Sequence, residues 1–388
     1  MPAAAVRLFF FRDMAIVRLL KNGTEVFPAM FSAIDGAASC IVLEMYIYAD
    51  DATGRAFRDR LVKAARRGVR VAVLVDAVGS WSLSDQFWDA LREAGGAVRR
   101  FRPVSRGMFL FRNHRKLLLV DDRIAYIGGL NIADEYFRGR GGEPPWRDNA
   151  LEITGHEVLR LKLSFDRMWT GAELPLRKAV LHLRRQRERN RPAAGGLEFL
   201  ESGPEDLMQH VRKAYRELIS ASRDRIDLAM GYFYPSGRIL RALKRAVSHG
   251  VRVRLLFPQK SDVAVARWAA RGLYGRLLRA GIEVWEYRPS MLHAKLAIMD
   301  NAVIAGSANL DIRSGRINYE LVAVVRDAEL AVRARRDFEE DLLQADRIAL
   351  EAWKDRPVMQ KLKERVSYWL LARLDIFFAR AQMARMMR

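Results

Sequence analysis

The chain repeats its own pattern, and this repeat restricts the possible folds more than any other feature of the sequence. In both halves an apolar, β-branched run is followed by a helical stretch, a glycine and a second β-branched run. These segments are residues 41–48, 56–67 and 68–76 in the first half, and 226–234, 238–249 and 250–257 in the second. This order is typical of a sheet with crossover helices. The sequence therefore predicts two α/β units of the same plan.

Each half then adds another helical stretch and a short strand-like run. These segments are residues 83–94 and 97–101, and residues 264–280 and 282–287. An arginine-rich segment that ends in a proline and glycine cluster separates the halves, as expected of a linker. We predict a first domain at 1–176, a basic linker at 177–196, a second domain at 197–345 and an amphipathic helical tail at 346–388.

Both units end in the same set of polar residues. The shared pattern is H-x-K-x4-D followed by G-[GS]-x-N, and its members are His114, Lys116, Asp121, Gly128, Gly129 and Asn131, and His293, Lys295, Asp300, Gly306, Ser307 and Asn309. In a chain with six histidines, chance would give about 0.01–0.02 matches to the first part of the pattern. Two matches at the same point of a repeat indicate function.

The spacing within the motif suggests phosphate chemistry. Residues i and i+2 of a strand lie on one face, so each histidine shares a face with its lysine. Two facing units would place two imidazoles, two ammonium groups and two amides around one cavity. A nucleophile and an acid on opposite sides of a phosphate are what in-line displacement requires. Because the lysines neutralise phosphate oxygens, we expect neither a metal nor a cofactor.

Composition narrows the partners. Lys and Arg outnumber Asp and Glu by 67 to 46, a net charge of +21, which favours nucleic acid or an anionic membrane. About half of this charge lies in residues 177–191, with +6, and 351–388, with +5. The single cysteine, Cys40, excludes an internal disulfide framework. No secretory signal or transmembrane run is evident.

These motifs resemble the phospholipase D superfamily over roughly residues 17–326. Within it, the chain is most similar to bacterial cardiolipin synthases of the short subtype, which lacks N-terminal transmembrane helices. The matching segments are residues 113–116, 128–136 and 146–148, and 292–295, 306–311 and 318–320. The resemblance implies two tandem phospholipase D-like α/β domains with pseudo-twofold symmetry, an active site at their interface and a C-terminal helical tail.

The resemblance also implies roles for individual residues. His114 is the expected nucleophile that forms a phosphatidyl-histidine, and His293 the expected acid and then base. Glu320 would orient His114, and Asp148 would orient His293, each from the partner half. Asn131, Asn309 and Ser307 are the candidate phosphate-binding residues. Asp121 and Asp300 complete the candidate catalytic set with Lys116 and Lys295, although their positions favour turn-forming roles.

One departure from the family pattern concerns the second motif. Six residues separate Asp121 from Gly128, but only five separate Asp300 from Gly306. We expect a tighter hairpin at Asn301. A slip in strand register there would turn Asn309 away from the site.

The implied function is a phosphatidyltransferase that makes cardiolipin from phosphatidylglycerol at the cytoplasmic face of the cell membrane, as a peripheral protein. With water as the acceptor the enzyme would be a phospholipase, and with DNA as the substrate it would be a nuclease. If the site were vestigial, the protein would be a basic protein that binds membrane or nucleic acid. In the tail, an apolar stripe favours lipid over nucleic acid. The stripe runs through Leu362, Val366, Leu370, Leu374, Phe377 or Phe378, and Ala381. The tail is either an interfacial helix or a helix docked on the protein, and residues 108–111 are either a membrane loop or a strand.

Overall fold

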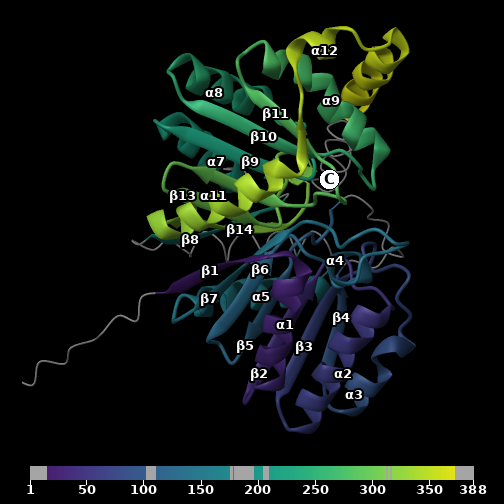
Figure 1. Ribbon diagram of the computed structural model, residues 1–388. Helices are drawn as coiled ribbons and strands as arrows, with labels where there is room; N and C mark the ends of the chain where they lie inside the picture. The colour runs from purple at the N-terminus through teal and green to yellow at the C-terminus, as the bar shows by residue number, and fades with distance from the viewer. Residues whose placement is uncertain are drawn as a thin grey trace, which may run out of the picture.

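The structure is a computed structural model that describes residues 15–101, 111–174, 178, 196–203, 209–311, 313–314 and 317–371. Two α/β domains lie one against the other, the first in purple and blue and the second in green and yellow (Figure 1). Each is built around one mixed sheet with the same strand arrangement. The predicted fold class is confirmed.

The first domain has a seven-stranded sheet in the order β1-β7-β6-β5-β2-β3-β4. Strands β2, β3 and β4 are parallel, and the remaining pairs are antiparallel. The strands are β1 (Ile16–Lys21), β2 (Cys40–Met45), β3 (Arg70–Asp76), β4 (Ala97–Phe101), β5 (Leu117–Val120), β6 (Ile124–Gly128) and β7 (Asn149–Thr154). The helical elements are α1 (Asn22–Asp35), α2 (Ala52–Arg66), η1 (Gln86–Trp88), α3 (Asp89–Glu93), α4 (Asp134–Phe137) and α5 (Val158–Glu173).

The second domain repeats this order and adds one strand, giving β15-β11-β10-β9-β12-β13-β14-β8. Its strands are β8 (Leu197–Ser202), β9 (Arg225–Met230), β10 (Arg252–Pro258), β11 (Glu283–Tyr287), β12 (Lys295–Met299), β13 (Ala302–Gly306), β14 (Glu320–Arg326) and β15 (Ala345–Arg347). Its helices are α7 (His210–Ala221), α8 (Gly237–Ser248), α9 (Ala264–Leu278), α11 (Ala328–Leu343) and α12 (Leu350–Lys354).

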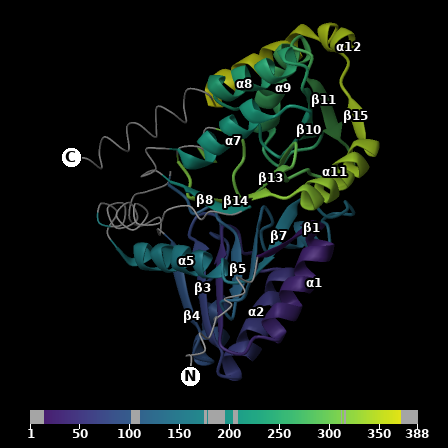
Figure 2. The ribbon, with the colours of Figure 1, turned by 90° about the vertical axis from the view of Figure 1, so that its left-hand side faces the viewer.

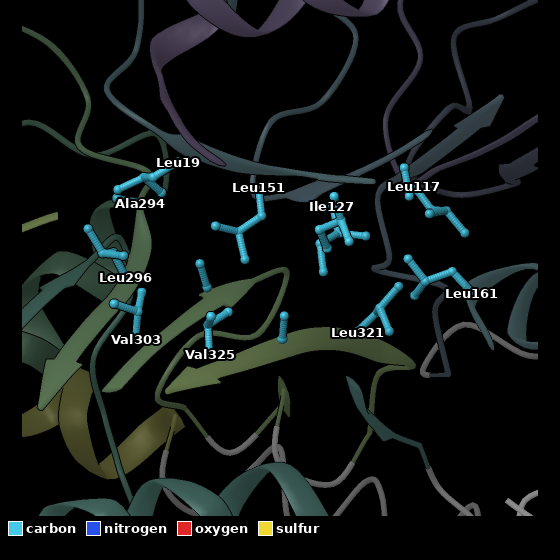
Figure 3. Packing of buried hydrophobic residues seen from close by; sticks show 14 of the residues in the cluster. Leu19, Leu117, Ile127, Leu151, Leu161, Ala294, Leu296, Val303, Leu321 and Val325 are labelled. Atoms are coloured by element: carbon cyan, nitrogen blue, oxygen red, sulfur yellow. The ribbon is translucent and has the colours of Figure 1, made fainter. Parts of the chain in front are cut away.

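The inner faces of the two sheets bury a shared hydrophobic core. Figure 3 shows Leu151 and Ile127 of the first sheet facing Val325 and Leu321 of the second, and all four are essentially inaccessible to solvent. The outer face of each sheet packs on its own helices as a separate core. Because strands buried on both faces need apolar side chains on both, the sequence shows continuous apolar runs here instead of alternation. The shared core fixes the domains relative to each other.

Strand registers show how the second motif accommodates its shorter hairpin. Leu117 pairs with Ile127 in β5 and β6, and Leu296 pairs with Ala305 in β12 and β13. Each leucine directly follows the motif lysine, and each partner directly precedes the motif glycine. The register is therefore the same in both halves. The second hairpin is shorter by one residue in its turn, between Met299 and Ala302. The tighter hairpin that the sequence predicts is therefore present, and the strand register does not slip.

Asp121 and Asp300 stand at these turns and brace them. Asp121 has φ of 54° and accepts hydrogen bonds from the backbone N–H groups of Ala38, Ser39 and Cys40 at 2.7–2.9 Å. Asp300, with φ of 48°, accepts three such bonds from residues 223–225 at 2.8–3.1 Å. Against the opposing effect of burial, the backbone donors lower the pKa of Asp121 to about 2. Both carboxylates tie a hairpin to the start of the neighbouring strand.

Two segments differ from the sequence-based expectation. In the stretch expected to be helical at 83–94, a 3-10 helix starts at Gln86 and the α-helix α3 only at Asp89. The second sheet also extends beyond the predicted boundary at residue 345, since β15 pairs with β11 through Arg347. Most of the predicted linker, residues 177–196, lies outside the described residues.

The turn aspartates lead to a stability prediction. Asp121→Ala should lower the free energy of unfolding by about 1–2 kcal/mol, because three backbone donors lose their acceptor. Asp121→Asn, which keeps one acceptor oxygen, should lower it less. Urea denaturation measures both. Turnover per folded molecule should stay near that of the wild type. Loss of turnover with an unchanged denaturation midpoint would instead give Asp121 a chemical role.

Candidate active site

The two motifs meet at the domain interface because each motif segment pairs, backbone to backbone, with a segment of the other domain. Asn113 forms a parallel bridge with Tyr319, and the His114 N–H donates to the Tyr319 carbonyl at 3.0 Å. Arg147 forms a parallel bridge with Leu292, and the His293 N–H donates to the Arg147 carbonyl at 2.8 Å. In each bridge, the next residue along one segment is a histidine and the next residue along the other is a carboxylate. His114 thereby lies beside Glu320, and His293 beside Asp148.

His114 and Glu320 form the first pair. The His114 Nδ1 lies 3.0 Å from Glu320 Oε2, and the glutamate is fully buried. The Ser307 hydroxyl donates to the same oxygen at 2.5 Å and accepts from the Leu321 N–H at 2.9 Å. Ser307 was predicted to bind phosphate, but its hydroxyl is engaged in orienting this carboxylate. With Nδ1 held by Glu320, the His114 Nε2 is left for chemistry.

His293 and Asp148 form the second pair. The His293 Nδ1 lies 2.7 Å from Asp148 Oδ2, and the Asn149 N–H donates to Asp148 Oδ1 at 2.8 Å. Gly129 occupies the motif position that Ser307 occupies in the other half. A Cβ on Gly129 would lie 2.3 Å from Asp148 Oδ1. Glycine is needed there so that the carboxylate can reach the histidine.

The two motif lysines are buried beside the histidines. The Lys116 Nζ donates to the His114 carbonyl at 2.6 Å, and the Lys295 Nζ lies 2.6 Å from His293 Nδ1 and 3.7 Å from Asp148 Oδ2. Both are at most 3% exposed. Burial lowers the pKa of Lys116 to about 7, against the attraction of Glu320. Burial also lowers the pKa of Lys295, against Asp148 and Glu320. An anion bound beside these lysines would raise their pKa and favour their charged form.

Burial shapes the protonation of the catalytic candidates as well. It lowers the pKa of His114 to about 4, outweighing the attraction of Glu320. Burial and the Lys295 charge lower the pKa of His293. Although burial opposes it, Lys295 and His293 keep the pKa of the Asp148 carboxyl below its ordinary value. At neutral pH the unliganded site therefore holds neutral imidazoles beside an ionised aspartate.

Aromatic side chains that lie outside the two sequence motifs line both histidines. The Tyr46 ring meets the His114 ring edge-on with centroids 4.7 Å apart. Around His293, the centroids of Tyr136, Trp146 and Tyr232 lie 5.5–5.9 Å from the imidazole, and the Tyr136 hydroxyl is 3.3 Å from Nδ1. Tyr46 and Tyr232 follow β2 and β9, the strands next to β5 and β12. That position was the signal available in the sequence.

The two motif asparagines have different surroundings. The Asn131 Oδ1 accepts from the Ile47 N–H at 3.2 Å, and its Nδ2 donates to the Tyr136 hydroxyl at 2.8 Å. Asn131 thus holds Tyr136 against His293. Asn309 is 6% exposed, and among the described residues its Oδ1 has no hydrogen-bond partner. Phosphate binding by either asparagine stays a prediction.

The interface pairing receives further support from buried ion pairs. Arg147 Nη2 lies 2.8 Å from Asp341 Oδ2 of α11, and both side chains are 1% exposed. Arg147 Nη1 also donates to the Asp148 carbonyl at 2.7 Å. In the first domain, Arg115 lies 3.2 Å from Glu44 with both side chains buried. The chain around both histidines is therefore fixed by charged groups that would be strongly destabilising if left unpaired.

Comparison with known proteins gives the family. The family described as "Cardiolipin synthase, PLD-like domain" matches residues 30–169 and 215–342, which include both motifs. The chain belongs to this family. The predicted resemblance to bacterial cardiolipin synthases of the phospholipase D superfamily is confirmed.

Individual relatives agree with the family match. A cardiolipin synthase of Geobacillus sp. is 36% identical over 363 residues, covering 90% of this chain and 70% of that protein. Cardiolipin synthase A of Pseudomonas fluorescens is 35% identical over 360 residues, covering 90% and 73%. A phosphatidylserine synthase of Haemophilus influenzae shares the fold, with a TM-score of 0.73, 14% identity and 94% coverage of each chain. Within the described residues, no helix has the length and apolar character that crossing a bilayer requires.

The lowered pKa of His114 leads to a prediction for the pH dependence of activity. A nucleophilic His114 must be neutral, and its pKa of about 4 lies below the ordinary 6.5. The acid limb of kcat/KM, which reports the free enzyme, should therefore appear near pH 4 and not near 6.5. A soluble short-chain phospholipid, assayed between pH 3.5 and 7, measures it. An acid limb near 6.5 would contradict the assignment.

The same shift affects stability, and its sign is fixed. Because the folded protein resists protonating His114, the unfolded chain binds more protons between pH 6.5 and 4. Folding stability should therefore fall as pH falls through this range. Denaturation measured across the range separates this loss from the catalytic limb, and His114→Ala should reduce it.

Proposed function

We propose that the protein synthesises cardiolipin by moving a phosphatidyl group from one phosphatidylglycerol to a hydroxyl of another. The observation that carries this proposal is the exchange of carboxylates across the interface, Glu320 to His114 and Asp148 to His293. It gives two imidazoles of fixed orientation that can play opposite roles around one phosphate. The names of the relatives support the lipid substrate.

In the first step, His114 Nε2 attacks the phosphorus and the bond to the departing glycerol oxygen breaks. The proton that this oxygen requires comes from the imidazolium of His293, whose pKa rises as the bound phosphate anion offsets the nearby lysine charge. Lys116 and Lys295 stabilise the negative charge on the non-bridging oxygens. The products are free glycerol and a phosphatidyl group on His114, which Glu320 stabilises as a cation.

In the second step, neutral His293 removes the proton from the acceptor hydroxyl, which attacks the same phosphorus. The bond to His114 Nε2 breaks and its electron pair returns to the ring. With a lipid acceptor the product is cardiolipin, and with water it is a phosphatidic acid. The relatives' names favour the lipid acceptor over the hydrolase and nuclease alternatives.

A donor lipid with a nitrophenol leaving group tests this mechanism. Nitrophenolate leaves without a proton, so His293→Ala should release about one equivalent per enzyme and then stop, because no base activates the acceptor. His114→Ala should release none. Mass spectrometry of the stalled His293→Ala protein should find the phosphatidyl group on His114. His249→Ala, an exposed histidine on α8's C-terminal side, is the control and should turn over normally. A burst from His114→Ala would refute the nucleophile assignment.

We further propose that the protein acts as a peripheral protein on anionic membrane and uses the surface of its tail. The cytoplasmic side stays a prediction. The described part of the tail contains α12 and helical residues 358–371. Of the alternatives drawn from the sequence, the described part of the tail is docked on α9, and its interfacial role is part of this proposal. The predicted stripe beyond residue 371 lies outside the described residues, as do residues 108–110, and Phe111 is fully buried.

The tail helix docks on α9 by a side that includes Glu364 and Tyr368. Glu364 is 1% exposed, 2.6 Å from Arg356 and 3.8 Å from Arg271 of α9. Its backbone passes so close to α9 that a Cβ on Gly272 would lie 3.0 Å from the Glu364 carbonyl oxygen. The opposite side carries Met359, Leu362 and Val366, which are 47–64% exposed. A helix that buries a carboxylate and exposes a spaced apolar row has the polarity expected of a membrane-facing surface.

Substitution of this row tests the membrane surface. The triple variant Met359→Gln, Leu362→Gln and Val366→Gln should bind vesicles containing phosphatidylglycerol about ten-fold or more weakly, because it removes apolar groups from the interface. Nitrophenolate release from soluble substrate should not change. Val332→Gln with Leu343→Gln, at exposed positions of α11, is the control. Equal binding of the triple variant and the wild type in sedimentation assays would exclude this surface.

A further inference from the structure

A basic cavity lies between the starts of α7 and α8, and none of the motif histidines or lysines is among its lining residues. Its volume is about 300 Å³, and its lining includes Gln209, Arg212, Lys213, Arg216, Ser236 and Arg238. The two helices lie side by side in both ribbon views (Figures 1 and 2). Four of these six side chains are cationic and none is acidic. Because both helices begin here, their N-terminal N–H groups add positive potential.

Two of the cationic side chains in this cavity are available to a ligand. Lys213 lies 3.8 Å from Glu217. Across the described residues, no acidic side chain comes within salt-bridge distance of Arg216 or Arg238. Both arginines are exposed, so their heads are accessible to a ligand. A site that gathers arginines around helix N-termini is suited to phosphate.

The internal repeat supplies an independent observation. The registers of β2 and β9 place Ser236 at the position that Asp51 holds in the first half. The Asp51 carboxylate accepts from the Gly54 N–H at 2.8 Å and from the Asp134 N–H at 2.7 Å, which caps α2. Ser236 makes no side-chain cap to α8. The start of α2 is thus capped by the Asp51 carboxylate, whereas the start of α8 has no side-chain cap and is surrounded by cationic side chains.

The cavity also adjoins the loop that serves the active site. A small neighbouring cavity shares Arg212 and Ser236 with it and reaches Asn309 and Asp311. Asn309 is two residues beyond Ser307, which holds the His114 carboxylate partner. Its buried Oδ1, which has no donor among the described residues, is placed to accept from a hydroxyl. Asp311 lies close enough to the site to affect the charge state of Lys295.

We propose that the α7–α8 cavity binds the phosphate of the second phospholipid, the acceptor, with its glycerol hydroxyls directed past Asn309. This inference rests on the proposed function, since only a transferase with an anionic acceptor needs a second phosphate site. The donor's phosphorus occupies the histidine pairs. The cavity would make the enzyme prefer an anionic acceptor over a neutral alcohol. Free inorganic phosphate carries the same chemistry and should compete for the cavity.

The experiment uses the full chain, the nitrophenyl donor lipid and two soluble acceptors, glycerol and a short-chain phosphatidylglycerol. Arg216→Gln with Arg238→Gln should raise KM for the anionic acceptor about ten-fold, the loss expected from two charge-assisted contacts. KM for glycerol should change less than about two-fold, since glycerol has no phosphate. Arg216→Lys with Arg238→Lys should restore much of the preference. Lys244→Gln with Lys63→Gln, at exposed positions, is the charge-matched control.

Two further measurements separate the sources and the possible failures. Inorganic phosphate should inhibit the wild type competitively with the anionic acceptor and should lose this effect in the Arg216→Gln, Arg238→Gln variant. Equal loss with both acceptors, or no competition by phosphate in the wild type, would overturn the cavity assignment. Failure of the wild type to release nitrophenolate from the donor lipid would instead overturn the proposed function. Circular dichroism checks that the exposed substitutions leave the fold intact.

Discussion

The exchange of partners between the two domains is the interaction on which the rest of the structure depends. Each histidine comes from one domain and its carboxylate from the other, and a backbone bridge beside each pair sets the spacing. Neither domain alone would contain an oriented imidazole. The apolar inner faces of the sheets hold the two halves together, and Arg147 with Asp341 adds a buried ion pair across the same interface. Separating the domains would expose all these charges and this core at once, so catalysis and stability share one interface.

The two halves depart from internal symmetry around their histidines, so His114 and His293 have different surroundings. Ser307 shares Glu320 with His114, whereas Gly129 leaves Asp148 to His293. Tyr46 covers His114, but the equivalent position in the second half is Gly231, where a Cβ would lie 3.1 Å from the His293 Cα. His293 is instead surrounded by aromatic residues and the Tyr136 hydroxyl. Two chemically identical side chains thus have different donors, charges and access, which is what opposite roles require.

Much of the fold and the centre of the site could be predicted because they are written in local patterns. The β-branched runs and terminal glycines gave the strands and crossovers, and two copies of one spaced motif gave His114, Lys116, His293 and Lys295. The rest depends on contacts between residues far apart in the chain. Nothing near Ser307 shows that its hydroxyl binds Glu320 and not a phosphate, and nothing near Tyr46 shows that His114 will pack against it. β15 is too short to stand out in the sequence and exists because β11 offers an edge.

The tail is another segment whose surroundings could not be predicted from its local sequence pattern. Its apolar period alone fits either a docked or an interfacial helix, because both need an apolar stripe. The exposure of the described tail residues shows which side of this helix faces the protein. A helix held only by the hydrophobic effect would turn its stripe inward, but here the inward side carries Glu364, paired with Arg356 and Arg271, beside Tyr368. The exposed row of Met359, Leu362 and Val366 is then a cost in water that an interface removes. Residues 351–388 carry +5 of the net charge, so an anionic lipid surface would match both the charge and the exposed row, and this is the membrane contact that we propose.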